Sequence, residues 1–332
     1  MIYTHVLNRG AEVFAVQFAW SREPRRWLRL LMRIDVIRLV LSVAWTVLLV
    51  TGSAGQALAA RSQGPVIKVT ANDGTSLAVE CAGAGPTLLI VHGGTGDRQR
   101  WLPLFPLFTR NFTVCAMDRR GHGQSEPGSN YSLHKEFEDV VAVVNALPGP
   151  VFVLGHSLGG VCAIEAAFLT KKIAKLVLYE PPLQDLDHTA IADAMDQMIR
   201  TGRREEALVT FLQDVVMLSP AEIATMKAQP SWPNRVVGID AQLREIRALS
   251  VYHFDPKRMR TLKVQTLLLT GSKTASPQLK QAIRSLMDSL PLRSLYVFEG
   301  QEHNAMDNLP GQFAEAVTNF LLSKYKTSTA VW

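Results

Sequence analysis

The sequence predicts an α/β fold: a mostly parallel, eight-stranded sheet covered by helices on both faces, with a helical lid inserted after the sixth strand. From residue 66 onward, short apolar runs alternate with helical segments, which is typical of a parallel sheet with right-handed crossovers. Between residues 183 and 250 no strand-like run is present, and the alternation resumes at residue 264. Open α/β sheets bind ligands beyond the carboxyl ends of their strands, so we expect this helical block to cover that edge.

The first four strands precede the most informative motif. Residues 66–70 and 76–81 read as a hairpin, because an Asn-Asp-Gly turn joins them. Residues 87–91 are continuously apolar, as in a strand buried on both faces. The predicted elements then follow as a helix at 98–109, a strand at 112–117 and a helix at 132–146.

A nucleophile turn follows the fifth strand. The apolar run at 151–154 leads into Gly-His-Ser-Leu-Gly at 155–159 and then directly into a helical segment at 161–170. Strand, sharp turn and helix are the context that a Gly-x-Ser-x-Gly nucleophile elbow requires. The serine sits at a strained backbone angle, and glycines allow the strand and the helix to approach closely. We therefore predict Ser157 as the catalytic nucleophile.

The second half of the chain completes the sheet. We divide the chain into an export segment at 1–59, a sheet core at 60–182 and 251–332, and a lid at 183–250. The predicted elements are a strand at 174–179, lid helices at 189–201, 205–218, 220–227 and 236–248, a strand at 264–270, a helix at 278–289, a strand at 294–298 and a helix at 310–324.

The distribution of charge argues against nucleic-acid binding. Of the net charge of +6, five units lie in residues 1–61, which hold eight arginines against three acidic residues. The remainder is nearly neutral and has no basic surface signature. A hydrophobic content of 47% fits a globular protein with a sizeable core.

The basic N-terminal segment instead resembles an export signal. Arg29, Arg33 and Arg38 precede an uncharged run at 39–50, and a small-residue stretch ends in Ala-Leu-Ala at 57–59. This order predicts a secreted or periplasmic protein cleaved after Ala59, with an unusually long lead before Met32 that a start codon assigned too early would explain. The alternative is an uncleaved membrane anchor at 39–60, in which case this segment is the only membrane contact.

Three cysteines, Cys81, Cys115 and Cys162, carry no metal or redox pattern. Cys81 and Cys115 lie in predicted strands, where a disulfide is sterically conceivable. We expect buried free thiols instead. We also expect no metal and no cofactor.

A serine hydroxyl needs a base within hydrogen-bond reach, and the chain has eight histidines. Only His303 lies in a loop after the last strand, which fits the chain order nucleophile, acid, histidine. We predict His303 as the general base.

These motifs together carry a family resemblance. From about residue 66 to 324 the chain resembles the α/β-hydrolase fold superfamily, through His-Gly-Gly at 92–94, Asp-Arg-Arg-Gly-His-Gly-Gln-Ser at 118–125, the turn at 155–159 and Gly-Gln-Glu-His at 300–303. The resemblance implies that the backbone N–H groups of Gly94 and Leu158 hold the oxyanion, and that the run at 118–125 braces nearby loops.

The acid departs from the usual pattern of that family. The family usually places its aspartate directly after the strand that here spans 264–270. In this chain that strand is followed by Gly-Ser-Lys-Thr-Ala-Ser, which contains no carboxylate. Some members place the acid after the strand that follows the elbow helix, which here gives Glu180. Asp185, Asp187 and Asp255 are weaker rivals, and a dyad without an acid remains open.

The lid suggests the substrate. Its apolar residues favour an uncharged, small or medium-sized apolar substrate, and no arginine clamp for a carboxylate or phosphate is recognisable. Trp101, Trp232, Tyr252 and Phe254 are candidate pocket residues. We expect ester hydrolysis; C–C bond hydrolysis, acyl transfer, cofactor-free perhydrolase chemistry and a non-catalytic ligand-binding module are the alternatives. The sequence gives no oligomeric state.

Overall fold

The computed structural model describes residues 64–183 and 187–323. All of them belong to one compact unit. The predicted export segment lies outside the described residues. Within those residues, no helix combines the length and the apolar character needed to cross a bilayer.

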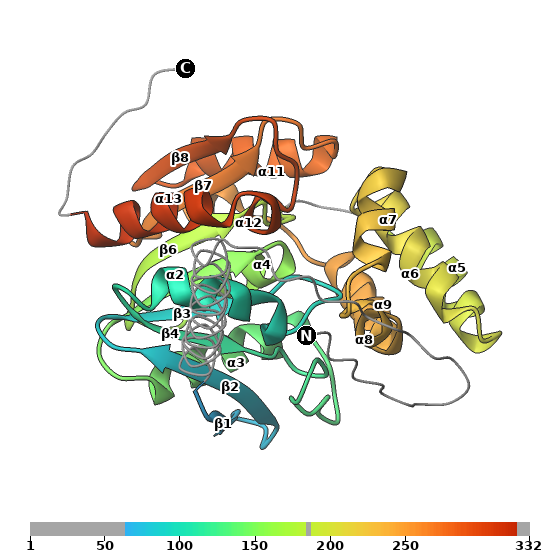
Figure 1. The fold of residues 1–332 in the computed structure, drawn as a ribbon, viewed down its shortest axis with the longest axis horizontal. Helices are drawn as coiled ribbons and strands as arrows, with labels where there is room; N and C mark the ends of the chain where they lie inside the picture. Colours follow the sequence, from blue (N-terminus) through green and yellow to red (C-terminus); the bar gives the residue numbers. More distant parts are fainter. Residues whose placement is uncertain (1–63, 184–186, 324–332) are drawn as a thin grey trace, which may run out of the picture. The chain divides into compact units, whose positions relative to one another are not determined.

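An eight-stranded sheet with the order β1-β2-β4-β3-β5-β6-β7-β8 organises the chain (Figure 1). Strands β1 and β2 pair antiparallel to each other, and β2 is antiparallel to β4, whereas the pairs from β4 to β8 are parallel. This confirms the predicted fold class. The strands are β1 (Val66–Thr70), β2 (Ser76–Gly83), β3 (Thr87–Val91), β4 (Thr113–Met117), β5 (Val151–His156), β6 (Ile173–Tyr179), β7 (Gln265–Gly271) and β8 (Arg293–Phe298).

Helices cover both faces of the sheet. On one face α3 (Leu133–Ala146), α4 (Leu158–Ala166), α10 (Pro256–Met259) and α11 (Pro277–Ser289) pack on a core that includes Leu89, Val153 and Leu268. On the other face η1 (Arg98–Leu104), α2 (Phe105–Phe108) and α13 (Pro310–Leu322) pack on Ile90, Leu154 and Leu267. A short helix, α12 (Ala305–Asn308), precedes α13. Alternate residues of each buried strand thus enter different cores, as the pleat of a strand requires.

The predicted helix at 98–109 is two shorter elements. The 3₁₀ segment η1 contains Pro103, and α2 has Pro106 in its first turn. Proline has no backbone N–H and its ring clashes with the preceding turn, so a continuous α-helix cannot form across both positions.

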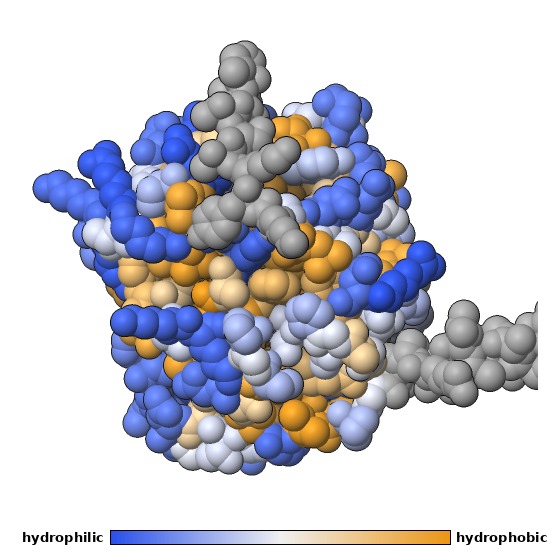
Figure 2. All heavy atoms as spheres, turned by 90° about the vertical axis from the view of Figure 1, so that its left-hand side faces the viewer, coloured by the Kyte–Doolittle hydropathy of each residue, from blue (hydrophilic) through white to orange (hydrophobic). Residues whose placement is uncertain are grey.

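The insertion after β6 is entirely helical. It consists of α5 (Thr189–Arg200), α6 (Arg204–Thr210), the π-helical turn η2 (Phe211–Val215), α7 (Pro220–Lys227), α8 (Trp232–Val237) and α9 (Ile239–Leu249). Its own apolar cluster includes Met195, Leu208 and Ile246. In Figure 1 these helices lie to one side of the sheet. The face turned away from them mixes hydrophilic and apolar surface (Figure 2).

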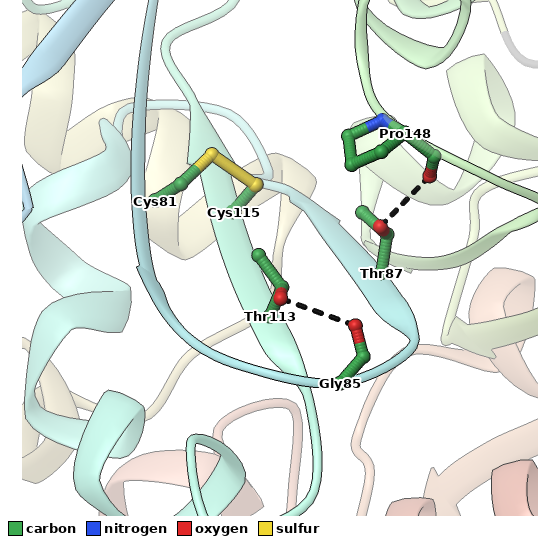
Figure 3. Close-up of a disulfide and its surroundings, with 6 residues drawn as sticks. All are labelled: Cys81, Gly85, Thr87, Thr113, Cys115 and Pro148. Atoms are coloured by element: carbon green, nitrogen blue, oxygen red, sulfur yellow. Dashed lines mark hydrogen bonds between the residues drawn. A yellow bond between two sulfur atoms is a disulfide. The ribbon is translucent and has the colours of Figure 1, made fainter.

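Cys81 and Cys115 form a disulfide, so the expectation of two free thiols is wrong (Figure 3). The two residues are directly opposite each other in the antiparallel pair β2–β4, with Cα atoms 4.1 Å apart. That separation matches a non-hydrogen-bonded antiparallel pair, where side chains come closest. Cys162 is a buried free thiol.

Candidate active site

Strand register brings the predicted site residues to one edge of the sheet. Val91 of β3 pairs with Gly155 of β5, and His156 pairs with Tyr179 of β6. Because parallel strands end at the same edge, the segments that follow them meet there. Gly94 follows β3, Ser157 follows β5, Glu180 follows β6, Thr274 follows β7 and His303 follows β8.

The turn at Ser157 has the geometry that the motif predicts. Ser157 has φ 52° and ψ −126° and stands directly before α4. A Cβ at Gly159 would lie 2.3 Å from the Val91 carbonyl oxygen, and one at Gly155 would lie 2.5 Å from the Gly159 carbonyl oxygen. Both distances are far below van der Waals contact, so only glycine allows the strand and helix to pack this closely.

Glu180 and His303 are hydrogen-bonded. His303 Nδ1 lies 2.6 Å from Glu180 Oε2, and both side chains are buried. Glu180 has φ 45°, a left-handed backbone conformation that is uncommon for a residue other than glycine. Such strain persists only where surrounding structure enforces it, and it is concentrated at functional sites.

The second oxygen of Glu180 is held by the loop after β7. Oε1 accepts from Thr270 Oγ1 at 2.7 Å, from the Gly271 N–H at 3.0 Å and from Thr274 Oγ1. The segment that lacks the expected aspartate thus supplies three donors to the carboxylate of the neighbouring strand. Both oxygens have partners, which fixes the orientation of the carboxylate toward His303.

These contacts keep Glu180 ionised. Burial raises the pKa of its carboxyl, but the hydrogen bond and charge of His303, together with the hydroxyls of Thr274 and Thr270, lower the pKa by more. The net pKa lies below that of an ordinary glutamate. A carboxylate in this state can hold the imidazole in one tautomer and stabilise its protonated form.

Tyr179 supports the loop that carries His303. Its hydroxyl donates to the carbonyl of Glu302 and accepts from the Ala305 N–H at 3.0 Å. His156 Nε2 lies 3.1 Å from the carbonyl oxygen of His303, and the two rings are 4.6 Å apart. No local pattern in the sequence indicates this role of Tyr179, because its position relative to a loop 123 residues away depends on the sheet order.

The other candidate acids are placed elsewhere. Asp187 is exposed and accepts from the Thr189 N–H at 2.9 Å. Asp255 caps α10 through a bond from the Lys257 N–H at 2.8 Å. Asp185 lies outside the described residues. Of the described candidates, only Glu180 contacts His303.

Gly94 and Leu158 border the cavity that contains Ser157 and His303. Leu158 is the first residue of α4, so its N–H has no carbonyl one turn earlier in the helix to bond. A Cβ on Gly94 would lie 2.2 Å from Gln242 Oε1 of α9, so a larger residue at this position requires the Gln242 side chain to move.

The cavity around Ser157 has a largely apolar wall. It runs between the sheet edge, the lid and the loop that precedes α11. The apolar side chains along it are Leu158, Phe211, Val215, Ile246, Leu249 and Leu279.

None of the four predicted pocket residues lines this cavity. Trp101 is fully buried in the core, 6.1 Å from the ring of Phe313, and Trp232 packs inside the lid cluster. The Tyr252 hydroxyl donates to Glu165 Oε1 at 2.7 Å, and Phe254 packs, partly buried, against the core that includes Val153 and Leu268. The sequence placed Trp101 near the oxyanion loop and the other three aromatic residues in the lid. It did not give the direction of their side chains, which tertiary packing decides.

Polar lid residues that the sequence analysis did not single out reach the cavity instead. Gln242 and Glu245 of α9 line it, and each has one side-chain oxygen that is buried without a hydrogen-bond partner. Arg100 and Arg235 line its continuation beside Ser157 and His303. Two arginine side chains therefore lie beside the site, where the lid sequence showed no recognisable arginine clamp. The sequence did not indicate that these two arginines lie close together, because Arg100 belongs to η1 and Arg235 belongs to α8, far apart in the chain.

The charged side chains of the run at 118–125 are buried and held by ion pairs. Arg119 bonds Glu136 at 2.9 Å and Glu245 at 3.0 Å, and His122 Nε2 lies 2.5 Å from Glu245 Oε1. Asp118 accepts from the Arg98 N–H at 2.8 Å. Because Glu245 belongs to the lid, this run joins helix α9 to the sheet core.

Comparisons with known proteins show the family to which the chain belongs. A family model described as the alpha/beta hydrolase family matches residues 88–316. The 2-(acetamidomethylene)succinate hydrolase of Mesorhizobium japonicum is 24% identical over 74% of this chain and 91% of its own length. A human serine hydrolase-like protein is 32% identical over 43% of this chain and 70% of its own length.

Solved structures give the same fold. An alpha/beta hydrolase from Sphaerobacter thermophilus is 28% identical, with a TM-score of 0.68 over 77% of this chain and all of its own. An esterase from Exiguobacterium antarcticum is 19% identical, with a TM-score of 0.62 over 77% of this chain and 99% of its own. At that lower identity the likeness concerns the fold alone.

Proposed function

Because the chain belongs to the alpha/beta hydrolase family, we propose that this hydrolase is a serine esterase that acts through an acyl-enzyme. The observation that carries the proposal is the bond between Glu180 and His303, 2.6 Å long, at the edge of the cavity that holds Ser157. A nucleophile, a base and an orienting acid in this arrangement are the requirement for acyl transfer through serine.

The proposed reaction has two halves. The Ser157 hydroxyl attacks the ester carbonyl while His303 Nε2 takes its proton and then gives it to the departing alcohol. In the second half, His303 takes a proton from a water molecule as the water attacks the acyl-enzyme. The proton is then returned to the Ser157 oxygen, and the acid product leaves. Glu180 keeps the imidazole oriented and stabilises its charged form throughout. No cofactor enters either half.

The backbone N–H groups of Gly94 and Leu158 hold the negative oxygen in both halves. Donors that are fixed before the reaction stabilise the charge that develops in the transition state by roughly 3–4 kcal/mol each. The apolar wall formed by Phe211, Ile246 and Leu279 receives the hydrocarbon part of a small or medium-sized substrate.

Labelling with a fluorophosphonate tests the nucleophile. Wild-type protein is expected to gain one adduct on Ser157, and Ser157→Ala none. A panel of p-nitrophenyl esters of graded acyl length then reports turnover. Labelling without ester turnover favours C–C hydrolysis, acyl transfer or perhydrolase chemistry on the same triad. An unlabelled wild-type protein favours a ligand-binding module.

We further propose that the protein is exported through its N-terminal segment. The Cys81–Cys115 disulfide supports this proposal, because disulfides persist in oxidising compartments. N-terminal sequencing of the secreted or periplasmic protein is expected to begin at Ala60. Recovery of the uncleaved chain with membranes identifies residues 39–60 as an anchor instead.

A further inference from the structure

Two arginines stand beside the proposed nucleophile. Arg100 of η1 and Arg235 of α8 line a branch of the cavity that also contains Ser157 and His303. The same two arginines border a larger neighbouring cavity with Thr95. They therefore stand between the nucleophile and that second space, one from the core and one from the lid.

The hydrogen bonds of these arginines are incomplete. Arg100 Nη2 donates to Asn304 Oδ1 and to Asp307 Oδ2, each at 2.7 Å. Arg235 Nη1 donates to Thr95 Oγ1 at 3.1 Å. The Nε–H groups of both arginines are buried without a hydrogen-bond partner. Buried donors in this state are uncommon, because each loses its bond to water without gaining another.

Arg235 also lacks a counterion. It is 5% exposed, and no carboxylate of the described residues lies within ion-pair distance of its guanidinium. Burial lowers its pKa to about 10, with the charge of Arg100 acting in the same direction and the more distant Asp307 and Asp97 opposing it. A buried charge without a partner is costly. The carboxylates that the chain places nearby do not compensate this one.

A purely structural role leaves these observations unexplained. The bond from Arg235 to Thr95 joins the lid to the loop of Gly94, but a neutral donor makes such a bond without burying a charge. Arginine is suited to planar, bidentate recognition of a carboxylate. Arg235, with its unpaired Nε–H donor and its uncompensated charge, lines a branch of the cavity that also contains Ser157.

We propose that the substrate carries a carboxylate, which Arg235 and Arg100 hold in this branch while the scissile ester lies at Ser157. The proposal rests on the proposed esterase function and makes its substrate amphipathic. The apolar wall takes the hydrocarbon part, and the arginines take the charged end.

Substrate pairs in which the carboxylate is either free or methylated test the proposal. The acyl-side pair is p-nitrophenyl hydrogen adipate and methyl p-nitrophenyl adipate; the alcohol-side pair is 4-acetoxybenzoate and its methyl ester. In at least one pair, wild-type enzyme is expected to show a kcat/KM at least tenfold higher for the carboxylate, and Arg235→Gln is expected to lose that ratio. Arg200→Gln, an exposed lid arginine paired with Asp196, is the matched control and should retain it.

The ratio of the two kcat/KM values within a pair distinguishes a loss of carboxylate recognition from a loss of folded protein. A general loss of activity lowers both kcat/KM values by the same factor and leaves their ratio unchanged. Equal kcat/KM values within both pairs for wild type, or a ratio that survives in Arg235→Gln, overturns the proposal. Binding of monomethyl and dimethyl adipate to Ser157→Ala provides a readout without turnover. Tighter binding of the monoacid, lost on adding Arg235→Gln, supports the site even if no ester is cleaved, and equal binding contradicts it.

Discussion

Glu180 and His303 are 123 residues apart in the chain, and their side chains are joined by a hydrogen bond of 2.6 Å. The bond crosses from the end of β6 to the loop after β8, over the strand whose loop lacks an acid. Thr270 and Gly271 of that intervening strand hold the other oxygen of Glu180. The Glu180 carboxylate thus lies at the end of β6, is oriented by donors from β7, and accepts a hydrogen bond from His303 after β8.

Replacing Glu180 by glutamine tests this arrangement. Glu180→Gln should lower kcat by about a thousandfold or more, because the neutral amide neither fixes the tautomer of His303 nor stabilises its charged form. Steady-state kinetics together with circular dichroism measure the effect in a folded protein. A variant that retains near-normal turnover removes Glu180 from the mechanism.

Glu245 should stabilise the lid on the core in a pH-dependent way. Burial raises the pKa of its carboxyl, but Arg119 and His122 lower it to about 2, below the 4.5 of an ordinary glutamate. Its stabilising contribution is therefore complete above pH 4.5 and is lost as the pH falls toward 2. Glu245→Gln should cost about 3 kcal/mol at pH 7, because Arg119 loses one of its two counterions.

Urea unfolding at pH 7 and pH 3 measures that difference, with exposed Glu315→Gln as the control. The stability gap between wild type and Glu245→Gln should narrow at the lower pH. A gap of equal size at both values would contradict the ion-pair account.

Glu302 should have the opposite pH dependence. Burial and the neighbouring carboxyl of Glu222 in α7 raise its pKa to about 7. Since the folded pKa exceeds the unfolded one, ionisation of Glu302 destabilises the fold as the pH rises from 4.5 through 7. Glu302→Gln should raise the Tm by about 2 °C at pH 8 and leave it nearly unchanged at pH 4.5. Differential scanning calorimetry with Glu315→Gln alongside measures this; equal shifts at both pH values would refute it.

The disulfide should contribute substantially to stability. It joins residues 34 positions apart, and closing a loop of that length in the unfolded chain is worth about 3–4 kcal/mol. Replacing Cys81 and Cys115 together by alanine should reduce the free energy of unfolding accordingly. Reductant should destabilise wild type and have no effect on the double variant; insensitivity of wild type would show that the bond does not form.

The strands and the positions of Ser157 and His303 in the fold are predictable from sequence for a physical reason. Buried strands, the turn at Ser157 and the position of His303 are local patterns with fixed chain order. The pairing of Cys81 with Cys115 depends on the register of β2 against β4, which no local pattern contains. Arg235 belongs to α8 (Trp232–Val237), which ends at Gly238 before α9 begins, whereas the sequence predicted one helix at 236–248. Its place beside the cavity depends on how the lid packs on the core, which no local pattern contains.

The most direct test of the central claim is the covalent intermediate on Ser157. Wild-type protein mixed with p-nitrophenyl butyrate and quenched in acid before steady state should gain the mass of one butyryl group, mapped by peptide sequencing to Ser157. Glu180→Gln should accumulate the adduct far more slowly. Ester turnover that leaves no adduct and persists in Ser157→Ala would contradict the account.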